Sequence, residues 1–161
     1  MQTYIGTKIV KMRPMTRAEY NDYRGWPLPA DEDGSDEGYL VEYLDVWKPN
    51  VPGHDGYVSW SPKAPADNAY RPTSGMSFGL AVEALKKGLR VSRAGWNGKG
   101  MFLFLVPGSR FKVNRAPLLG IYPEGTEISY HAHIDMKTAD GQVVPWLASQ
   151  TDVLADDWMV S

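Results

Sequence analysis

The chain has 161 residues, of which 43% are hydrophobic, and a net charge of −2; this composition excludes wholesale disorder and gives no electrostatic basis for binding duplex nucleic acid. The absence of cysteine excludes disulfide frameworks and thiolate metal sites. The first residues lack the features of a signal peptide, and the longest apolar run, 101–107, is too short to cross a bilayer, so we expect no membrane partner.

The first half of the chain predicts a small α+β domain. A strand is expected over 7–12, and Thr16-Arg17-Ala18-Glu19 forms a capping-box pattern that starts a helix running to about Arg24. An acidic loop, 31–37, follows; its carboxylate spacing does not fit an EF-hand, so we interpret it as a solvated loop. Two further strands are expected over 38–44 and 56–60, and then a short helix capped by Ser61 with Pro62 as its first residue.

A change in composition divides the chain near Tyr70-Arg71-Pro72-Thr73-Ser74-Gly75. Proline, serine and glycine together are typical of a linker. Residues 1–75 carry a net charge of −3, whereas residues 76–161 carry +1. We therefore predict a domain over 1–71, a linker over 72–75 and a second domain over 76–161.

The second half predicts one helix and several strands. Ser77 is placed to cap a helix whose apolar residues recur at helical spacing, and Gly88 is placed to end it. Strands are expected over 89–92, over 101–106 as a strand buried on both faces, and over 128–138 and 142–147, joined by an Asp140-Gly141 type I′ turn. A short helix near Ser149 and an edge strand at 158–160 complete an α+β domain, a small antiparallel sheet packed on one helix.

The glycine-rich loop from Gly95 to Gly100 is the first candidate for a binding site. Its glycines let the backbone approach a ligand closely, and Trp96 offers a surface on which a nucleobase can stack. Asn97 presents amide donors and an acceptor, and Lys99 can meet a phosphate. A tight hairpin with a tryptophan in the core would show the same pattern.

A second candidate is the set His131, His133 and Asp135. On one continuous strand the three side chains would share a face, where they could hold a metal ion, but a plain polar sheet face would look the same. A basic set could neutralise a diphosphate or lie in solvated loops; it comprises Arg90, Arg93, Lys99, Arg110, Lys112 and Arg115. The sequence shows no catalytic triad pattern.

The second half also resembles a known family, the second type of Thoeris anti-defence domain of phages. The resemblance covers residues 76–161 and rests on the strings at 76–81, 92–102, 133–141, 144–152 and 157–158. Residues 1–75 are an addition to that pattern; they resemble a phage-protein segment without known function through the strings at 20–26, 36–41 and 56–63. Ala132 stands where the family pattern has proline.

The resemblance implies a sponge rather than an enzyme: a protein that binds and sequesters glycocyclic ADP-ribose, and in some relatives CBASS cyclic dinucleotides, without a cofactor or metal. It implies a homotetramer acting in the cytosol of the host bacterium. Carried over by position, Trp96 would stack on adenine and Phe78 would form a second wall. The other residues expected near the ligand are Asn97, Gly98, Lys99, Asp135 and Met136.

Two alternatives to the sponge stay open at this point. One is a metal-dependent hydrolase of the same signals that uses His131, His133 and Asp135. The other is a protein-interaction module that acts through the N-terminal half.

Overall fold

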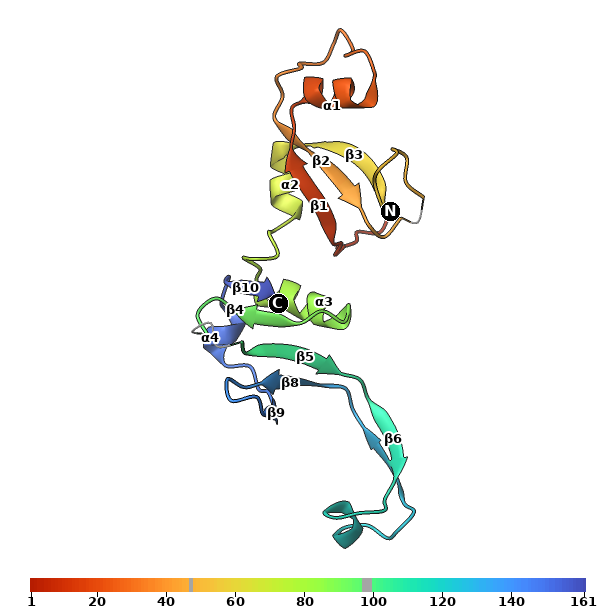
Figure 1. Ribbon diagram of the computed structural model, residues 1–161, viewed down its shortest axis with the longest axis vertical. Helices are drawn as coiled ribbons and strands as arrows, with labels where there is room; N and C mark the ends of the chain where they lie inside the picture. Colours follow the sequence, from red (N-terminus) through yellow and green to blue (C-terminus); the bar gives the residue numbers. More distant parts are fainter. Residues whose placement is uncertain (47, 97–99) are drawn as a thin grey trace. The chain divides into compact units, whose positions relative to one another are not determined.

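The computed structural model describes residues 1–46, 48–96 and 100–161, and these divide into two compact units, Met1–Arg71 and Pro72–Ser161 (Figure 1). Each unit combines helices with antiparallel strands, so the predicted α+β class is confirmed. Within the described residues no helix is long and apolar enough to span a membrane.

The N-terminal unit is a three-stranded antiparallel sheet with a helix on each face. Its strands lie in the order β1-β2-β3, and its elements are β1 (Val10–Pro14), α1 (Arg17–Arg24), β2 (Gly38–Tyr43), β3 (Tyr57–Pro62) and α2 (Lys63–Ala69). Tyr20 of α1 packs with Leu40 and Val58 on one face, and α2 lies against β2 and β3.

The ends of these elements follow from local hydrogen bonds. Thr16 and Glu19 form the predicted capping box, and Gly25 ends α1 in the left-handed conformation. The first strand begins later than the predicted 7–12, because only Val10–Pro14 pair with β2. Ser61 belongs to β3, so Pro62 rather than Ser61 is the cap of α2.

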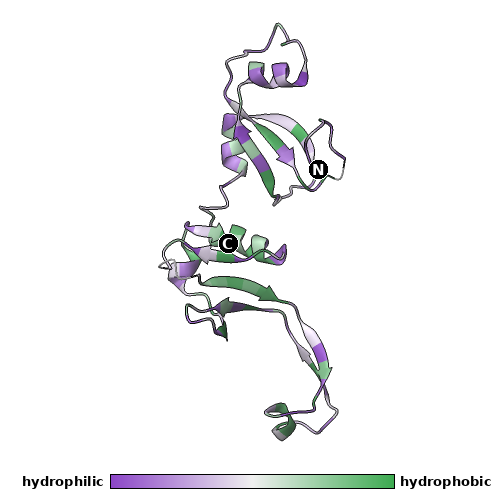
Figure 2. Ribbon diagram, in the orientation of Figure 1, coloured by the Kyte–Doolittle hydropathy of each residue, from purple (hydrophilic) through white to green (hydrophobic). Residues whose placement is uncertain are grey.

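The C-terminal unit places one helix on a five-stranded sheet. The sheet order is β10-β4-β5-β8-β9, and the helix α3 (Phe78–Lys86) covers one face. The strands are β4 (Val91–Arg93), β5 (Phe102–Val106), β8 (His133–Lys137), β9 (Val143–Pro145) and β10 (Trp158–Val160). Figure 2 shows the hydrophobic residues along α3 and β5. The core between helix and sheet includes Leu85, Val91, Leu103 and Trp158.

The helix α3 begins and ends where the sequence predicts. Ser77 occupies the cap position, although its side chain makes no capping hydrogen bond. At the other end Gly88 has φ +81°, and the N–H groups of Gly88 and Leu89 donate to the carbonyls of Leu85 and Ala84. These two bonds form a Schellman motif, which needs a residue that tolerates positive φ.

The strand β5 is buried on one face only, which corrects the prediction of burial on both. Leu103 is fully buried against α3, whereas Phe102, Phe104 and Val106 on the opposite face are half-buried. Within the described residues, α3 is the helix that packs against β5, and it lies on the face of Leu103. The opposite face of β5 is therefore not covered by that helix.

The expected strand over 128–138 is two strands. β7 (Glu127–Tyr130) pairs with β6 (Ser109–Lys112) in a separate two-stranded hairpin, and β8 pairs with β5. The hairpin continues away from the sheet and ends in a tip that holds the short 3₁₀ helix η1 (Leu118–Gly120) (Figure 1). The sequence did not predict β6, which was included in a possible solvated loop.

The turn between β8 and β9 has three residues rather than two. The Thr138 N–H donates to the Gln142 carbonyl, and the Gly141 N–H donates to the Thr138 carbonyl, with Gly141 at φ +88°. This pattern is typical of a three-residue hairpin with glycine in the left-handed position, not of the predicted type I′ turn.

Candidate functional site

Four aromatic rings gather beside the N-terminus of α3. Trp158 is fully buried, and its ring centroid lies 5.5 Å from Phe78, 5.4 Å from Trp96 and 6.0 Å from Trp146. Trp96 and Trp146 both meet Trp158 edge to face, at 75° and 84°. Such edge-to-face packing stabilises ring pairs by about 0.5–1.5 kcal/mol beyond area burial. The partly exposed Trp96 and Phe78 are therefore supported by one buried indole.

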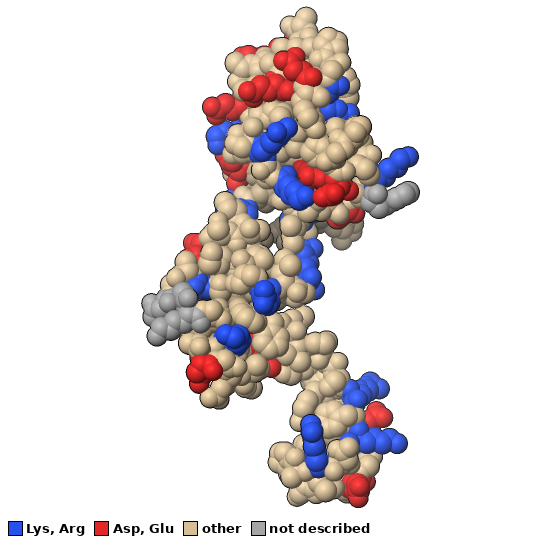
Figure 3. Space-filling view, viewed as in Figure 1, with Lys and Arg blue, Asp and Glu red and all other residues tan. Residues whose placement is uncertain are grey.

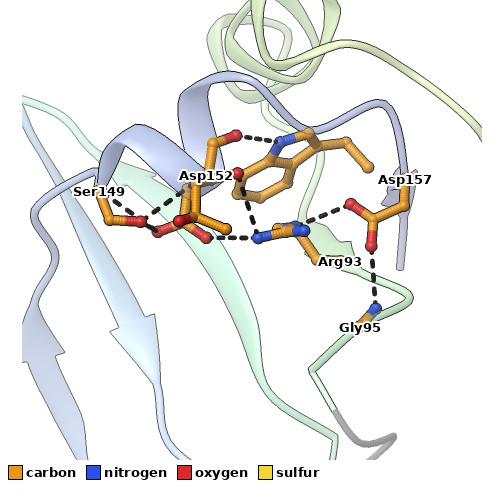
Figure 4. A network of polar contacts seen from close by, with 7 residues as sticks. Arg93, Gly95, Ser149, Asp152 and Asp157 are labelled. Carbon is orange, nitrogen blue, oxygen red and sulfur yellow. Dashed lines mark hydrogen bonds and ion pairs between the residues drawn. The ribbon is translucent and has the colours of Figure 1, made fainter.

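The backbone that carries Trp96 is fastened by a polar network (Figure 4). The Asp157 carboxylate accepts the Gly95 N–H at 3.0 Å through Oδ2 and the Arg93 Nε–H at 2.8 Å through Oδ1. The N–H of Trp96 donates to the Arg93 carbonyl, and that of Ala94 donates to the Asp157 carbonyl. The turn before Trp96 is thus bound at several points to the segment that leads into β10.

The same network joins the short helix α4 (Gln150–Val153) to the aromatic cluster. Arg93 also contacts Asp152 at 2.9 Å, and Asp152 and Ser149 form a capping box. The indole N–H of Trp158 donates to the Asp152 carbonyl at 2.9 Å. Figure 4 shows Arg93 between Asp152 and Asp157. The two carboxylates neutralise Arg93, so this arginine is not a free cation for a phosphate.

The charges of this network depend on one another. The Arg93 side-chain hydrogen bond holds the pKa of Asp157 below its ordinary value of 3.8, and the Gly95 N–H lowers it further. The hydrogen bonds to Asp157 and Asp152 raise the pKa of Arg93. At neutral pH the network therefore contains two carboxylates and a guanidinium, all ionised.

We expect acid to loosen this network. Because the folded-state pKa of Asp157 lies below 3.8, its stabilising contribution is complete above that pH and is lost as the pH falls through the folded-state value. The free energy of unfolding, measured with urea at pH 7 and at about pH 3, should fall less in Asp157→Asn than in the wild type. An equal fall in both proteins would contradict the assignment of this titration to Asp157.

The glycine-rich loop is described only at its two ends. Asn97, Gly98 and Lys99 lie outside the described residues. Trp96 is half-buried and packs against the core cluster, and the Gly100 carbonyl accepts a hydrogen bond from Lys137 at 3.1 Å.

Asp135 and Met136 occupy opposite faces of the sheet. Met136 packs against the core cluster that Phe78 and Trp96 also contact. Asp135 is its neighbour on β8, so its side chain points to the other face, where Phe104 is its partner across the strands. A single chain therefore brings Phe78, Trp96 and Met136 to one side of the sheet and Asp135 to the other.

The side chains of His131, His133 and Asp135 do not lie together on one face of one strand. His131 lies in the break between β7 and β8, and its carbonyl is 3.0 Å from Nδ1 of His133. His133 and Asp135 share a face, with 3.7 Å between Nε2 and Oδ1. Within residues 1–46, 48–96 and 100–161, no group of three or more such ligands lies close enough to hold a metal ion.

The basic residues are distributed over separate elements. Arg90 lies 4.8 Å from the centroid of the Phe102 ring, and Arg93 belongs to the polar network. Arg110, Lys112 and Arg115 are exposed on the hairpin and its tip, whose basic side chains are visible in Figure 3. These residues do not form the single diphosphate cluster that the sequence allowed, and Lys99 falls outside the described residues.

Two parts of the site were not predicted. Trp146 packs at 6.0 Å from Phe78, and Asp157 fastens the turn before Trp96. Both lie in strings that carry the family resemblance, at 144–152 and 157–158, but nothing in their spacing shows that they meet residues 50 or more positions earlier.

Comparisons with known proteins agree on the C-terminal unit. Residues 76–161 match the family model described as the Thoeris anti-defense 2-like domain. The protein named Thoeris anti-defense 2 from Bacillus phage SP01 is 47% identical over 83 residues, which cover 52% of this chain and 91% of that protein. The chain therefore belongs to the Thoeris anti-defense 2-like family, and its role is phage anti-defence.

Proposed function

We propose that this protein captures a cyclic nucleotide immune signal and holds it without cleaving it. The observation that carries the proposal is that neighbouring residues hold the Trp96 side chain in place. Its indole is partly exposed, packs edge to face on the buried Trp158, and follows a turn that Asp157 fastens. A tryptophan fixed in this way can stack on a purine with little loss of side-chain entropy on binding.

The ligand class that we propose is supported by the family and by the aromatic side chains of Trp96 and Phe78. Glycocyclic ADP-ribose carries an adenine ring that can stack on Trp96, with Phe78 beside it. CBASS cyclic dinucleotides carry purines of the same kind. The ring centroids of Trp96 and Phe78 lie 5.4 and 5.5 Å from the centroid of the buried Trp158 ring, so both side chains are supported by the same residue.

The ionisable groups beside Trp96 favour holding over catalysis. Arg93, Asp152 and Asp157 use their charges on one another, and the pKa of Asp157 is held below its ordinary value, chiefly by the Arg93 hydrogen bond. A carboxylate in that state is a weak general base at neutral pH. This supports a non-enzymatic role.

We further propose that the chain assembles with copies of itself, as a homotetramer. The hairpin of β6 and β7 supports this, because an isolated two-stranded hairpin is only marginally stable in water. Phe111 and Tyr130 pack edge to face on it with a third or more of their surface exposed, and the tip exposes Ile121 and Tyr122. A second copy of the chain would bury these side chains.

The experiment is a capture and release assay on the full chain. Purified protein is mixed with glycocyclic ADP-ribose, separated from free nucleotide, and heated; the released molecules are identified by mass spectrometry. We expect intact nucleotide, and a light-scattering mass near four times the 18.0 kDa chain. Cleaved products would overturn the non-enzymatic proposal, undepleted nucleotide would overturn capture, and a monomer mass would overturn assembly.

A further inference from the structure

The N-terminal unit contains a series of polar contacts that runs from a buried carboxylate to an exposed phenol. Glu42 of β2 is 6% exposed, and its Oε2 lies 3.3 Å from Nδ1 of His54. The other ring nitrogen of His54, Nε2, lies 2.7 Å from the hydroxyl of Tyr23 on α1. Tyr23 is 39% exposed, so the series ends at the surface.

The charge state of Glu42 decides the direction of these bonds. The N–H groups of Gly56 and Asp55 donate to its Oε1 at 3.0 and 2.7 Å, and the Gly56 bond is the main cause that lowers the pKa of Glu42. An ionised carboxylate only accepts hydrogen bonds, so Nδ1 of His54 carries the ring proton. In the tautomer with the proton on Nδ1, Nε2 is the acceptor, and the Tyr23 hydroxyl donates to it.

This arrangement has the three parts of an activated nucleophile. Tyr23 is the group that can attack, His54 is the base within hydrogen-bond reach, and Glu42 orients the base. If these contacts served only to stabilise the fold, the geometry would be the same but the phenol would not be more reactive than other exposed tyrosines. Reactivity therefore distinguishes the two roles.

One basic side chain beside Tyr23, that of Arg13, indicates the charge of its substrate. The Arg13 guanidinium lies 5.3 Å from the centroid of the Tyr23 ring. Within the described part of the chain, no carboxylate lies within ion-pair distance of Arg13. Lys11, two residues earlier on the same strand face, contacts Asp55 at 3.1 Å. A free guanidinium beside a nucleophile suits the oxygens of a phosphate.

We propose that Tyr23 is the nucleophile of a phosphoryl-transfer site on the N-terminal unit, with His54 as general base and an activated phosphate, an anhydride or aryl phosphate, as substrate. The phenolic oxygen bonds to phosphorus while its proton moves to Nε2 of His54. The bond from phosphorus to the leaving oxygen breaks, and His54 returns the proton to that oxygen. The product is phosphotyrosine at position 23.

The test measures the labelling of individual tyrosines in the full chain. A neutral fluorophosphonate forms the same oxygen–phosphorus bond and releases fluoride, and peptide mass spectrometry gives the rate at each residue. Tyr57, which is 44% exposed, is the internal control. We expect Tyr23 to react at least tenfold faster than Tyr57, because general-base catalysis contributes about 10²–10⁴-fold. Equal rates in the wild type would overturn the proposal.

Two variants separate the roles of the neighbours. His54→Gln keeps a hydrogen-bonding side chain without a base, and should bring Tyr23 to the rate of Tyr57 while circular dichroism stays unchanged. Arg13→Gln should slow phosphorylation of Tyr23 by anionic p-nitrophenyl phosphate more than it slows the reaction with the neutral fluorophosphonate, because the guanidinium interacts most strongly with a charged phosphate. An unchanged Tyr23 rate in folded His54→Gln would overturn the role of His54. If His54→Gln unfolds, the wild-type comparison of Tyr23 with Tyr57 still decides.

Discussion

Replacing Trp96 with alanine is expected to remove most of the capture of the cyclic nucleotide while the C-terminal unit stays folded. Stacking of a base on an aromatic ring contributes about 1–3 kcal/mol, which corresponds to roughly a 5- to 150-fold change in affinity. At nucleotide concentrations near the wild-type dissociation constant, such a loss leaves little bound signal. Trp96 is half-buried, so its removal takes less from the core than removal of a fully buried ring.

The measurement is titration calorimetry with glycocyclic ADP-ribose, with circular dichroism and light scattering to check fold and mass. Trp26→Ala is the matched control, because Trp26 is also a partly exposed tryptophan, 49% exposed, but belongs to the N-terminal unit. Trp96→Phe keeps a stacking ring and should retain most of the affinity. Wild-type affinity in folded Trp96→Ala would show that the base binds elsewhere.

The parts of the fold that the sequence predicted well are those controlled by neighbours in the chain. The helix α3 was predicted from apolar spacing and from Gly88, whose positive φ the Schellman motif requires. The capping box at Thr16 and Glu19 likewise depends on four consecutive residues. In both cases the hydrogen bonds that fix the element join residues fewer than six positions apart.

The missed elements depend on partners far along the chain. All residues of β6 are exposed, so Ser109–Lys112 shows no alternation of buried and exposed positions; only its pairing with Glu127–Tyr130 makes it a strand. That pairing also explains why the expected strand over 128–138 is divided. The first half of that segment pairs with β6, whereas the second half pairs with β5.

The candidate site divides in the same way, into features that depend on neighbouring residues and features that depend on distant ones. The glycine-flanked loop predicts Trp96 as a candidate, but the support of its ring comes from Trp158 and from Asp157, which is 62 positions from Gly95. By contrast, the separation of Asp135 from Met136 follows from the alternation of side chains along a strand. If both residues contact one ligand, the second contact must come from another copy of the chain.

Replacing Trp158 with alanine is expected to unfold much of the C-terminal unit. The side chain is fully buried, contacts three other aromatic rings, and donates its indole N–H to Asp152. Substitution of a buried tryptophan by alanine costs about 3–5 kcal/mol, a large part of the stability of a small domain. Its backbone also pairs with Met76 and β4, so the damage would reach the start of α3.

Hydrogen exchange with mass spectrometry can follow each unit separately in the same sample. In Trp158→Ala, peptides from α3 and β5 should lose protection, while those from β2 and β3 should exchange as in the wild type. Trp158→Phe keeps a ring at the centre of the cluster but loses the bond to Asp152 and part of the buried ring volume, so its loss of protection should be smaller than in Trp158→Ala. Unchanged protection of α3 in Trp158→Ala would show that the cluster does not hold the helix to the sheet. Because Trp96 rests on Trp158, capture should weaken in Trp158→Phe through displacement of Trp96 rather than through loss of the stacking ring.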